Sequence, residues 1–181
     1  MSESIVFLMG SPSATSRSTF IARTVAAEAE RAGLRPSFWS LNDFDPSDVL
    51  FGRGTAPGIA PFIDATKKAA GIVLATPVYK AVYTGALKAI VDLIPPDNLA
   101  GKPALGIATA KQAVHATTVD QAYRALFVFF QARAQETLFL RDDEVQLGPA
   151  AGVLSIEAEQ RLRNASRALV QAISDTARAA L

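Results

Sequence analysis

The chain has 181 residues, of which half are apolar and 19% are charged, and its formal net charge at pH 7 is +1. This composition is typical of one folded domain with a sizeable core, and it excludes a disordered chain. The near-zero charge argues against nucleic-acid binding, and the absence of cysteine together with a single histidine leaves no thiol chemistry and no metal site to expect.

The sequence shows no secretory signal at its N-terminus and no apolar stretch that is typical of a membrane span. The first ten residues lack the basic start and the long apolar stretch of a secretory signal. No segment reaches the ~18 uncharged apolar residues that a membrane span needs. We therefore expect a cytoplasmic protein that contacts no membrane. From the chain length we expect one domain over residues 1–181.

The first half of the sequence predicts two strands and two helices. The apolar run at residues 5–9 indicates a strand buried on both faces, which we place at the centre of a parallel sheet. After a polar loop, apolar residues at a spacing of three to four predict a helix that Gly33 ends. The next expected elements are a strand at 37–41, a surface connection rich in Gly and Pro at 42–61, and a short helix near 62–70.

The second half continues the alternation of strands and helices. The buried runs at 71–75 and 104–108 predict two more strands, with a helix at about 84–94 between them that Pro95 ends. The remaining expected elements are a helix at 115–135, a fifth strand at 137–140 and a long helix from residue 155. This order predicts an α/β fold: a flavodoxin-like, doubly wound, five-stranded parallel sheet with helices on both faces.

The loop after the first strand has the composition of a phosphate site. Residues 11–19 carry six hydroxyl groups, one arginine and no acidic residue, at the start of a helix. The loop lacks the glycine pattern of a dinucleotide site and the lysine of a triphosphate site, so a single phosphate monoester such as that of FMN fits better. Helix capping by the same Ser and Thr residues is the alternative interpretation.

The turn after the third strand offers flat side chains. Pro77 fixes the backbone as it leaves the sheet, Tyr79 and Tyr83 are aromatic, and Gly85 permits close packing at a helix start. The isoalloxazine ring of a flavin would lie against this turn.

Together these motifs resemble the NAD(P)H-dependent FMN reductases, particularly those that supply reduced flavin to alkanesulfonate monooxygenases. GSPSATSRS resembles the phosphate loop of that family, and TPVYK with the following TGALK is similar to its flavin-ring loop. The resemblance implies hydride transfer from NADPH or NADH to FMN, an FMNH2-dependent monooxygenase as partner, and a homodimer or homotetramer. The cofactors carry the hydride chemistry, so no catalytic side chain is expected.

Individual site residues follow from the resemblance. It assigns the FMN phosphate to Ser11, Ser16, Arg17, Ser18 and Thr19, and the flavin ring to Pro77, Val78, Tyr79, Lys80 and Gly85. It also places Thr109, Ala110 and Lys111 beside the flavin, where the family usually carries a Gly-Gly pair after the threonine. His115 would contact the flavin from the next helix, with a packing or capping role as the alternative. Gln121 stands where sulfonate-linked members often have an additional tyrosine.

Three other functions remain open at this stage. A quinone or azo-compound reductase of the same fold would keep FMN bound, a flavodoxin-like electron carrier would lack an NAD(P)H site, and a binding module would ignore flavin. Electron carriers of this kind are typically strongly acidic, which the net charge of +1 disfavours. The charged run at 141–144 (RDDE) is interpreted as a solvated strand end. The scarcity of sulfur, with no Cys and two Met, agrees with a role in organosulfur utilisation.

Overall fold

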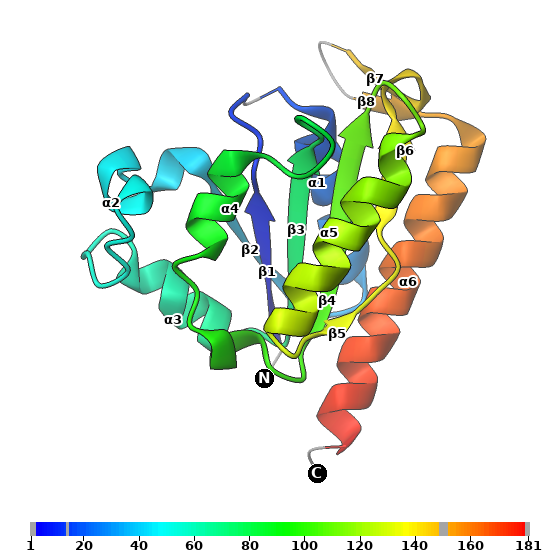
Figure 1. Cartoon of the computed structure of the whole chain (residues 1–181). Coiled ribbons are helices and arrows are strands. Elements are labelled where there is room, and N and C mark those ends of the chain that lie inside the picture. The colour runs from blue at the N-terminus through cyan, green and yellow to red at the C-terminus, as the bar shows by residue number, and fades with distance from the viewer. Residues whose placement is uncertain (1–2, 14, 149–151, 180–181) are drawn as a thin grey trace.

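A parallel sheet of order β2-β1-β3-β4-β5 lies at the centre of the fold, and β6 also pairs with β4, nearer to the carboxyl end of β4 than β5 does (Figure 1). The computed structural model describes residues 3–13, 15–148 and 152–179. The strands of this sheet are β1 (Ser4–Met9), β2 (Arg35–Ser40), β3 (Gly71–Pro77), β4 (Pro103–Ala110), β5 (Arg133–Ala134) and β6 (Leu138–Arg141). The predicted flavodoxin-like order is confirmed. The expectation for the first strand was wrong in one respect, because β3 and not β1 occupies the middle position.

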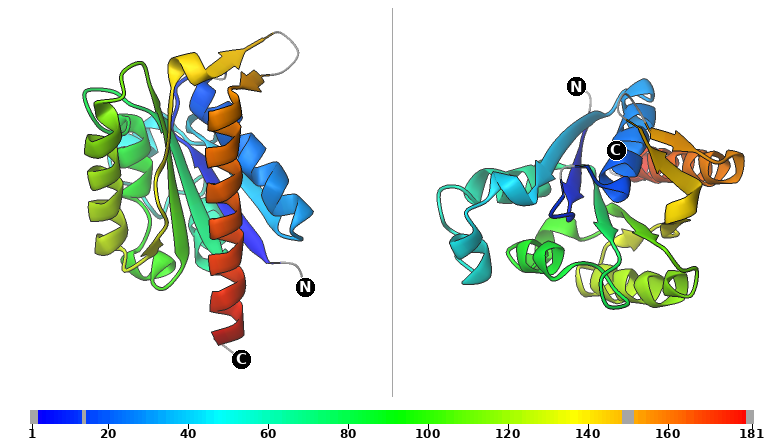
Figure 2. Two further views of the ribbon diagram at one scale, coloured as in Figure 1. Left: turned by 90° about the vertical axis from the view of Figure 1, so that its right-hand side faces the viewer. Right: turned by 90° about the horizontal axis from the view of Figure 1, so that it is seen from above.

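Helices cover both faces of the sheet, as predicted (Figure 2). The helices are α1 (Arg17–Arg31), α2 (Pro46–Leu50), α3 (Ala60–Lys68), α4 (Gly85–Val91), α5 (His115–Phe129) and α6 (Ile156–Ala179). Helices α1 and α6 pack on one face, and α3, α4 and α5 pack on the other. Short 3-10 turns are η1 (Leu41–Asp43), η2 (Pro96–Leu99) and η3 (Asp142–Glu144), and an antiparallel pair is formed by β7 (Val145–Leu147) and β8 (Gly152–Leu154).

Strand β1 divides its side chains between the two cores. Successive residues of a strand point to opposite faces. Ile5, Phe7 and Met9 therefore pack with α1 and α6, whereas Val6 and Leu8 pack with the helices on the other face. All five are almost completely buried, and burying such a side chain contributes about 1.5–3 kcal/mol. The end of β1, where the polar loop begins, is thus held firmly from both sides.

Tyr123 of α5 fills a space that a glycine leaves open in β4. A Cβ atom at Gly106 would lie 2.4 Å from Cδ2 of Tyr123, so only glycine allows the ring to rest on the strand. The buried hydroxyl lies 2.9 Å from the carbonyl oxygen of Leu74 and 3.2 Å from that of Ile107. Burial raises the pKa of Tyr123 well above its usual value. This contact fixes α5 against both β3 and β4.

Two helix ends show how far local signals reach. Helix α1 ends as predicted, because Gly33 adopts the left-handed conformation (φ 88°) and the N–H of Leu34 donates to the carbonyl of Ala29. Helix α5 ends at Phe129, earlier than the predicted residue 135. There the left-handed position belongs to Gln131 (φ 52°), a residue type that gives no stop signal in the sequence.

The fifth strand position is divided, and other short elements were not predicted. The expected strand at 137–140 is confirmed as β6, but β5 precedes it and also pairs with β4. The connection predicted at 42–61 includes most of η1, all of α2 and the first residues of α3. The β7–β8 pair was not predicted. Within the described part of the chain, no helix has the length and apolar character that crossing a bilayer requires.

Candidate functional site

A cavity of about 420 Å³ opens at the carboxyl ends of β1, β3 and β4. In open α/β sheets this is the edge where ligands bind. The lining residues are Ser11, Ser13, Thr15, Ser16, Arg17, Pro77, Val78, Tyr79, Thr109, Ala110, Lys111, Gln112, His115 and Asp142. The structure therefore brings together most of the residues that the sequence singled out, from three separate loops. Of the predicted site residues, Ser18, Thr19, Lys80 and Gly85 are not part of this lining.

Hydroxyl groups of the first loop are organised among themselves. The N–H of Ser13 donates to Oγ of Ser11 at 3.1 Å, and the hydroxyls of Ser16 and Ser18 are 2.8 Å apart. Ser18 is fully buried, so its side chain supports Ser16 instead of facing the cavity. Thr19 is half-buried one residue further into α1.

The start of α1 bears on the capping alternative. Among the described residues, Ser16 at the N-cap accepts no N–H of the helix through its side chain. The first N–H groups of a helix have no partner within the helix and carry the positive end of its dipole. Capping by Ser16 therefore does not account for this loop, and the helix end offers N–H donors to an anion.

Arg17 is anchored to the hairpin that the sequence did not predict. Its Nε donates to the carbonyl oxygen of Val145, the first residue of β7, at 2.9 Å. This bond uses one of the five N–H donors of the guanidinium group, and the side chain still lines the cavity. Two cations, Arg17 and Lys111, thus border the cavity with a single carboxylate, that of Asp142, which favours an anionic ligand.

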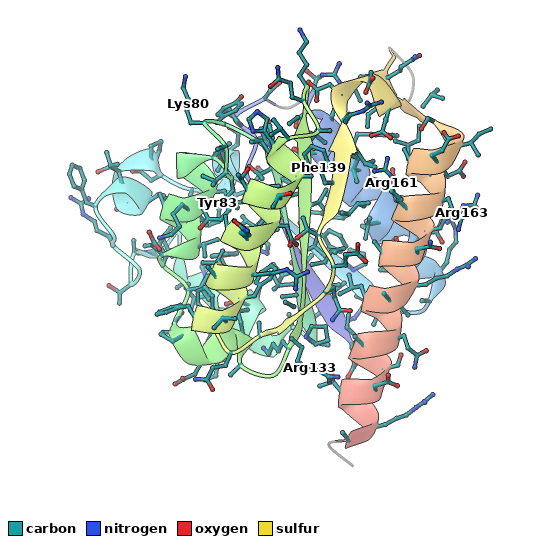
Figure 3. All side chains as sticks on the ribbon, turned by 45° about the vertical axis from the view of Figure 1, so that its right-hand side comes forward. Lys80, Tyr83, Arg133, Phe139, Arg161 and Arg163 are labelled. Carbon is teal, nitrogen blue, oxygen red and sulfur yellow. The ribbon has the colours of Figure 1, made fainter. Side chains whose placement is uncertain are left out.

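The segment after β3 forms a tight turn. The N–H of Tyr79 donates to the carbonyl of Val82 at 2.9 Å, and Lys80 and Ala81 between them have positive φ angles. Tyr79 lines the cavity with 52% of its surface exposed. Lys80 projects from the tip of the turn (Figure 3). Tyr83 instead packs against Tyr123, with ring centroids 5.6 Å apart, so only one of the two tyrosines expected to offer a flat face lines the cavity.

Close packing at this site depends on Gly10 and not on Gly85, which corrects the sequence interpretation. A Cβ at Gly85 would meet no atom of the described chain within 4 Å. At Gly10 a Cβ would lie 2.5 Å from Cβ of Leu87 in α4. Oγ1 of Thr84 also donates to the carbonyl of Gly10 at 2.7 Å. The first loop and the turn after β3 are therefore fastened together by α4.

The end of β4 and the start of α5 supply the third side of the cavity. Thr109 and Ala110 are buried, Lys111 is exposed, and His115 is half-buried at the first position of α5. Asp142 joins them, although the sequence interpretation placed it at a solvated strand end. It follows β6, whose last residue pairs with Ala110. Because parallel strands end at the same edge, this position in the sequence was a usable signal.

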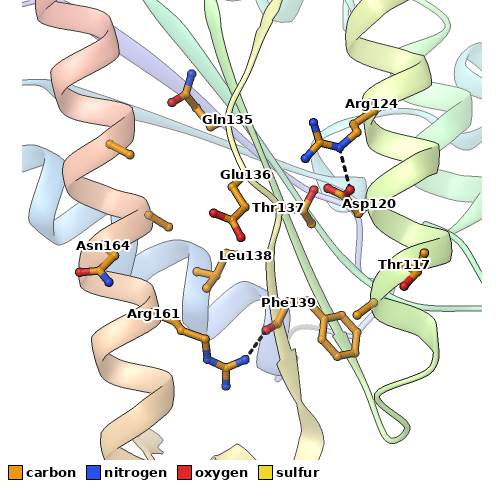
Figure 4. Close-up of a pocket in the computed structure, with 13 residues that line it drawn as sticks. Thr117, Asp120, Arg124, Gln135, Glu136, Thr137, Leu138, Phe139, Arg161 and Asn164 are labelled. Carbon is orange, nitrogen blue, oxygen red and sulfur yellow. Dashed lines mark hydrogen bonds and ion pairs between the residues drawn. The ribbon is translucent and has the colours of Figure 1, made fainter.

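A larger cavity of about 710 Å³ lies beside β6, between α5 and α6 (Figure 4). Three of its charged side chains have partners: Nε of Arg124 donates to Asp120 at 2.7 Å, and Arg161 binds Glu144 and the carbonyl of Phe139. Burial alone would raise the pKa of Asp120, but hydrogen bonds from Arg124 and from residue 137 lower it overall. The contact of Arg161 occupies a carbonyl of β6, a strand at the edge of the sheet. None of the predicted FMN-binding residues lines this groove.

Comparison with known proteins shows which family the chain belongs to. Residues 4–144 match the family model of NADPH-dependent FMN reductases. The chain belongs to the NADPH-dependent FMN reductase family. It is 35% identical over 144 residues to an FMN reductase (NADPH) of Escherichia coli (strain K12), covering 78% of this chain and 74% of that protein. It is 33% identical over 131 residues to the NADH-dependent FMN reductase SfnE of Pseudomonas putida, covering 71% and 70%.

Solved structures agree with the family. The apo form of the NADH:FMN oxidoreductase EmoB matches with a TM-score of 0.84 at 31% identity, over 94% of this chain and 89% of that chain. A flavodoxin of Streptococcus pneumoniae matches with a TM-score of 0.61 at 17% identity, over 93% and 98%, which supports the fold alone. This FMN reductase family member is accordingly a flavin reductase, an oxidoreductase that uses NAD(P)H to reduce FMN.

Proposed function

We propose that this flavin reductase binds FMN in the cavity at the ends of β1, β3 and β4 and supplies reduced flavin to an FMNH2-dependent monooxygenase in alkanesulfonate utilisation. The observation that carries the site is the convergence of the polar loop, the Tyr79 turn and the end of β4 on one cavity of about 420 Å³. The link to organosulfur compounds rests on the resemblance of both loops and on the scarcity of sulfur in the chain.

The donors of the cavity fit a phosphate monoester at one end. Ser11, Ser16 and the guanidinium group of Arg17 would hold the phosphate, together with the main-chain N–H groups at the start of α1. Ser18 and Thr19 would contribute through their main chain, because their side chains do not line the cavity.

The other sides of the cavity fit a flat ring. Pro77, Val78 and Tyr79 offer apolar and aromatic surface, and Thr109, Ala110 and Lys111 offer main-chain donors and a cation. Lys80, Gly85 and His115 are further candidates carried by the resemblance. When bound, FMN accepts a hydride from the reduced nicotinamide, so the chain's own task is to bind and orient the two partners.

We also propose a homodimer or homotetramer. Leu126 and Phe127 of α5 and Phe130 just after it are buried within the chain, but Val128 and Phe129 of α5 are 73% and 64% exposed. A second copy covering this part of α5 would remove those side chains from water. Size-exclusion chromatography with light scattering tests this point, and a monomer at micromolar concentration would contradict it.

Residues 145–179 are proposed to belong to the same domain as the family match, so that the chain forms one domain over 1–181. Leu162, Leu169 and Ile173 of α6 are buried in the core on the α1 face of the sheet. Truncation before α6 should therefore yield protein that does not fold.

The decisive experiment mixes the pure protein with FMN and either NADPH or NADH and follows the absorbance of the reduced coenzyme. We expect FMN-dependent oxidation of at least one coenzyme, and the comparison assigns the preference. Adding an alkanesulfonate monooxygenase and its substrate should then yield sulfite. Oxidation without sulfite would contradict the partner, and no oxidation at all would contradict the site. Flavin that stays bound on gel filtration would favour the quinone or azo-compound reductase.

A further inference from the structure

The turn after β3 adopts a conformation that its residues disfavour. Lys80 and Ala81 occupy its two central positions with φ angles of 51° and 80°. Two-residue turns of this kind usually contain Asn-Gly or Gly-Gly, because a Cβ atom is strained in the left-handed region. The main-chain bonds between Tyr79 and Val82 are 2.9 and 3.4 Å long, and the second is weak. Contacts from outside the turn must therefore help to hold it.

Thr118 of α5 provides such a contact. Its Oγ1 lies 2.8 Å from the carbonyl oxygen of Ala81 and 3.1 Å from that of His115, one helical turn earlier. A hydroxyl group carries one hydrogen, so it donates to one of these acceptors at a time. The shorter distance favours Ala81. Among the described residues, the hydrogen bond from Thr118 is the one side-chain bond that joins the main chain of residues 79–82 to another element.

The two elements that this contact joins, the turn after β3 and helix α5, both contribute residues to the proposed flavin cavity. Tyr79, at the base of the turn, and His115, at the start of α5, both line it. Thr118 itself does not. We propose that Thr118 is a positioning residue, which latches the strained turn to α5 and thereby holds Tyr79 at the flavin cavity. The effect of the latch on FMN rests on the proposed function, whereas the latch itself is a property of the free protein.

Loss of the latch should lower the fraction of molecules in which the turn is formed. Apparent affinity falls by the same factor as the competent fraction. A net hydrogen bond of ordinary strength changes the ratio of formed to open turn by about two- to tenfold. That factor is shared between the fall in the formed fraction, which weakens binding, and the rise in the open fraction, which speeds cleavage. Thr118→Val removes the donor and keeps the branched shape, while Thr118→Ser keeps the donor. Thr117→Val makes the same chemical change one residue away, on a side chain that lines the groove beside β6.

The first measurement needs no flavin. Lys80 is exposed at the tip of the turn, so trypsin can cleave after it, and cleavage after the exposed Arg53 is an internal reference in the same digest. We expect Thr118→Val to be cleaved after Lys80 several times faster than wild type relative to Arg53. Thr118→Ser and Thr117→Val should match wild type. The second measurement titrates FMN by flavin fluorescence, and binding should weaken in Thr118→Val alone, by no more than that two- to tenfold factor.

Each outcome gives a decision. Cleavage at Lys80 that is unchanged in Thr118→Val, or raised equally in Thr117→Val, overturns the latch. Failure of Thr118→Ser to restore the wild-type rate overturns it as well. Faster cleavage of Thr118→Val in a protein whose wild type does not bind FMN supports the latch and contradicts the proposed flavin site.

Discussion

Replacing Gly10 with alanine tests how tightly the first loop is fixed to α4. The new Cβ would lie 2.5 Å from Cβ of Leu87 and 3.0 Å from its Cγ. Because Cβ of Leu87 is attached directly to the helix backbone, rotation of the side chain cannot relieve the contact. Either α4 or the loop must move. Movement of the loop would disturb the 2.7 Å hydrogen bond from Thr84 to the carbonyl of Gly10.

The expected cost follows from these two contacts. Overpacking a core typically costs about 1–3 kcal/mol, and losing a buried hydrogen bond costs about 1 kcal/mol more. We expect Gly10→Ala to lower the free energy of unfolding by about 2–4 kcal/mol. In a domain of this size that corresponds to a fall of about 4–16 °C in Tm. FMN should also bind more weakly, because Gly10 begins the loop that carries Ser11.

Urea unfolding followed by circular dichroism measures this change. Gly58→Ala is the matched control, because a Cβ there meets no described atom within 4 Å and the residue has no positive φ. A free energy of unfolding of Gly10→Ala within about 0.5 kcal/mol of that of the control, the range of an ordinary surface substitution, would show that the first loop is not packed tightly against Leu87.

Three further predictions concern single side chains. Arg17→Ala should weaken FMN binding by about 1.5–3 kcal/mol through loss of a charge-assisted contact. Fluorescence titration measures this, with Arg23→Ala as the control, because it removes an arginine that stacks on Phe38 of β2. Equal affinities of the two variants would contradict the assignment of Arg17 to the phosphate. Tyr123→Phe should reduce the fall in the free energy of unfolding at alkaline pH. Burial raises the pKa of Tyr123 in the folded state, so its contribution to stability is present below the unfolded pKa of about 10 and is lost as the pH rises above it. If the urea midpoint of Tyr123→Phe depends on pH above about 10 as that of wild type does, the expectation is wrong. Arg161→Ala should leave the carbonyl of Phe139 on the edge strand β6 without this hydrogen bond and increase self-association, measured by light scattering. An unaltered mass distribution would show that this hydrogen bond does not prevent association through β6.

The strands and the main helices were predictable because their signals are local. Buried runs such as 71–75 and 104–108 are continuous and apolar, since both faces of a central parallel strand are covered. Helix α1 ends where Gly33 permits a left-handed residue. The end of α5 could not be predicted in this way, because Gln131 adopts the left-handed conformation there and is not a glycine.

The amino-acid sequence alone determined the order of strands and helices, and with it the edge of the sheet at which the polar loops meet, because hydrophobic periodicity and turn residues act over a few positions. Only the tertiary structure decided that Ser18 and Tyr83 turn inward, that Asp142 joins the cavity and that Arg17 is tied to Val145. It also decided that Thr118 meets Ala81. Such contacts join residues that are distant in the chain, and their direction depends on how helices pack across the sheet, which no local pattern records.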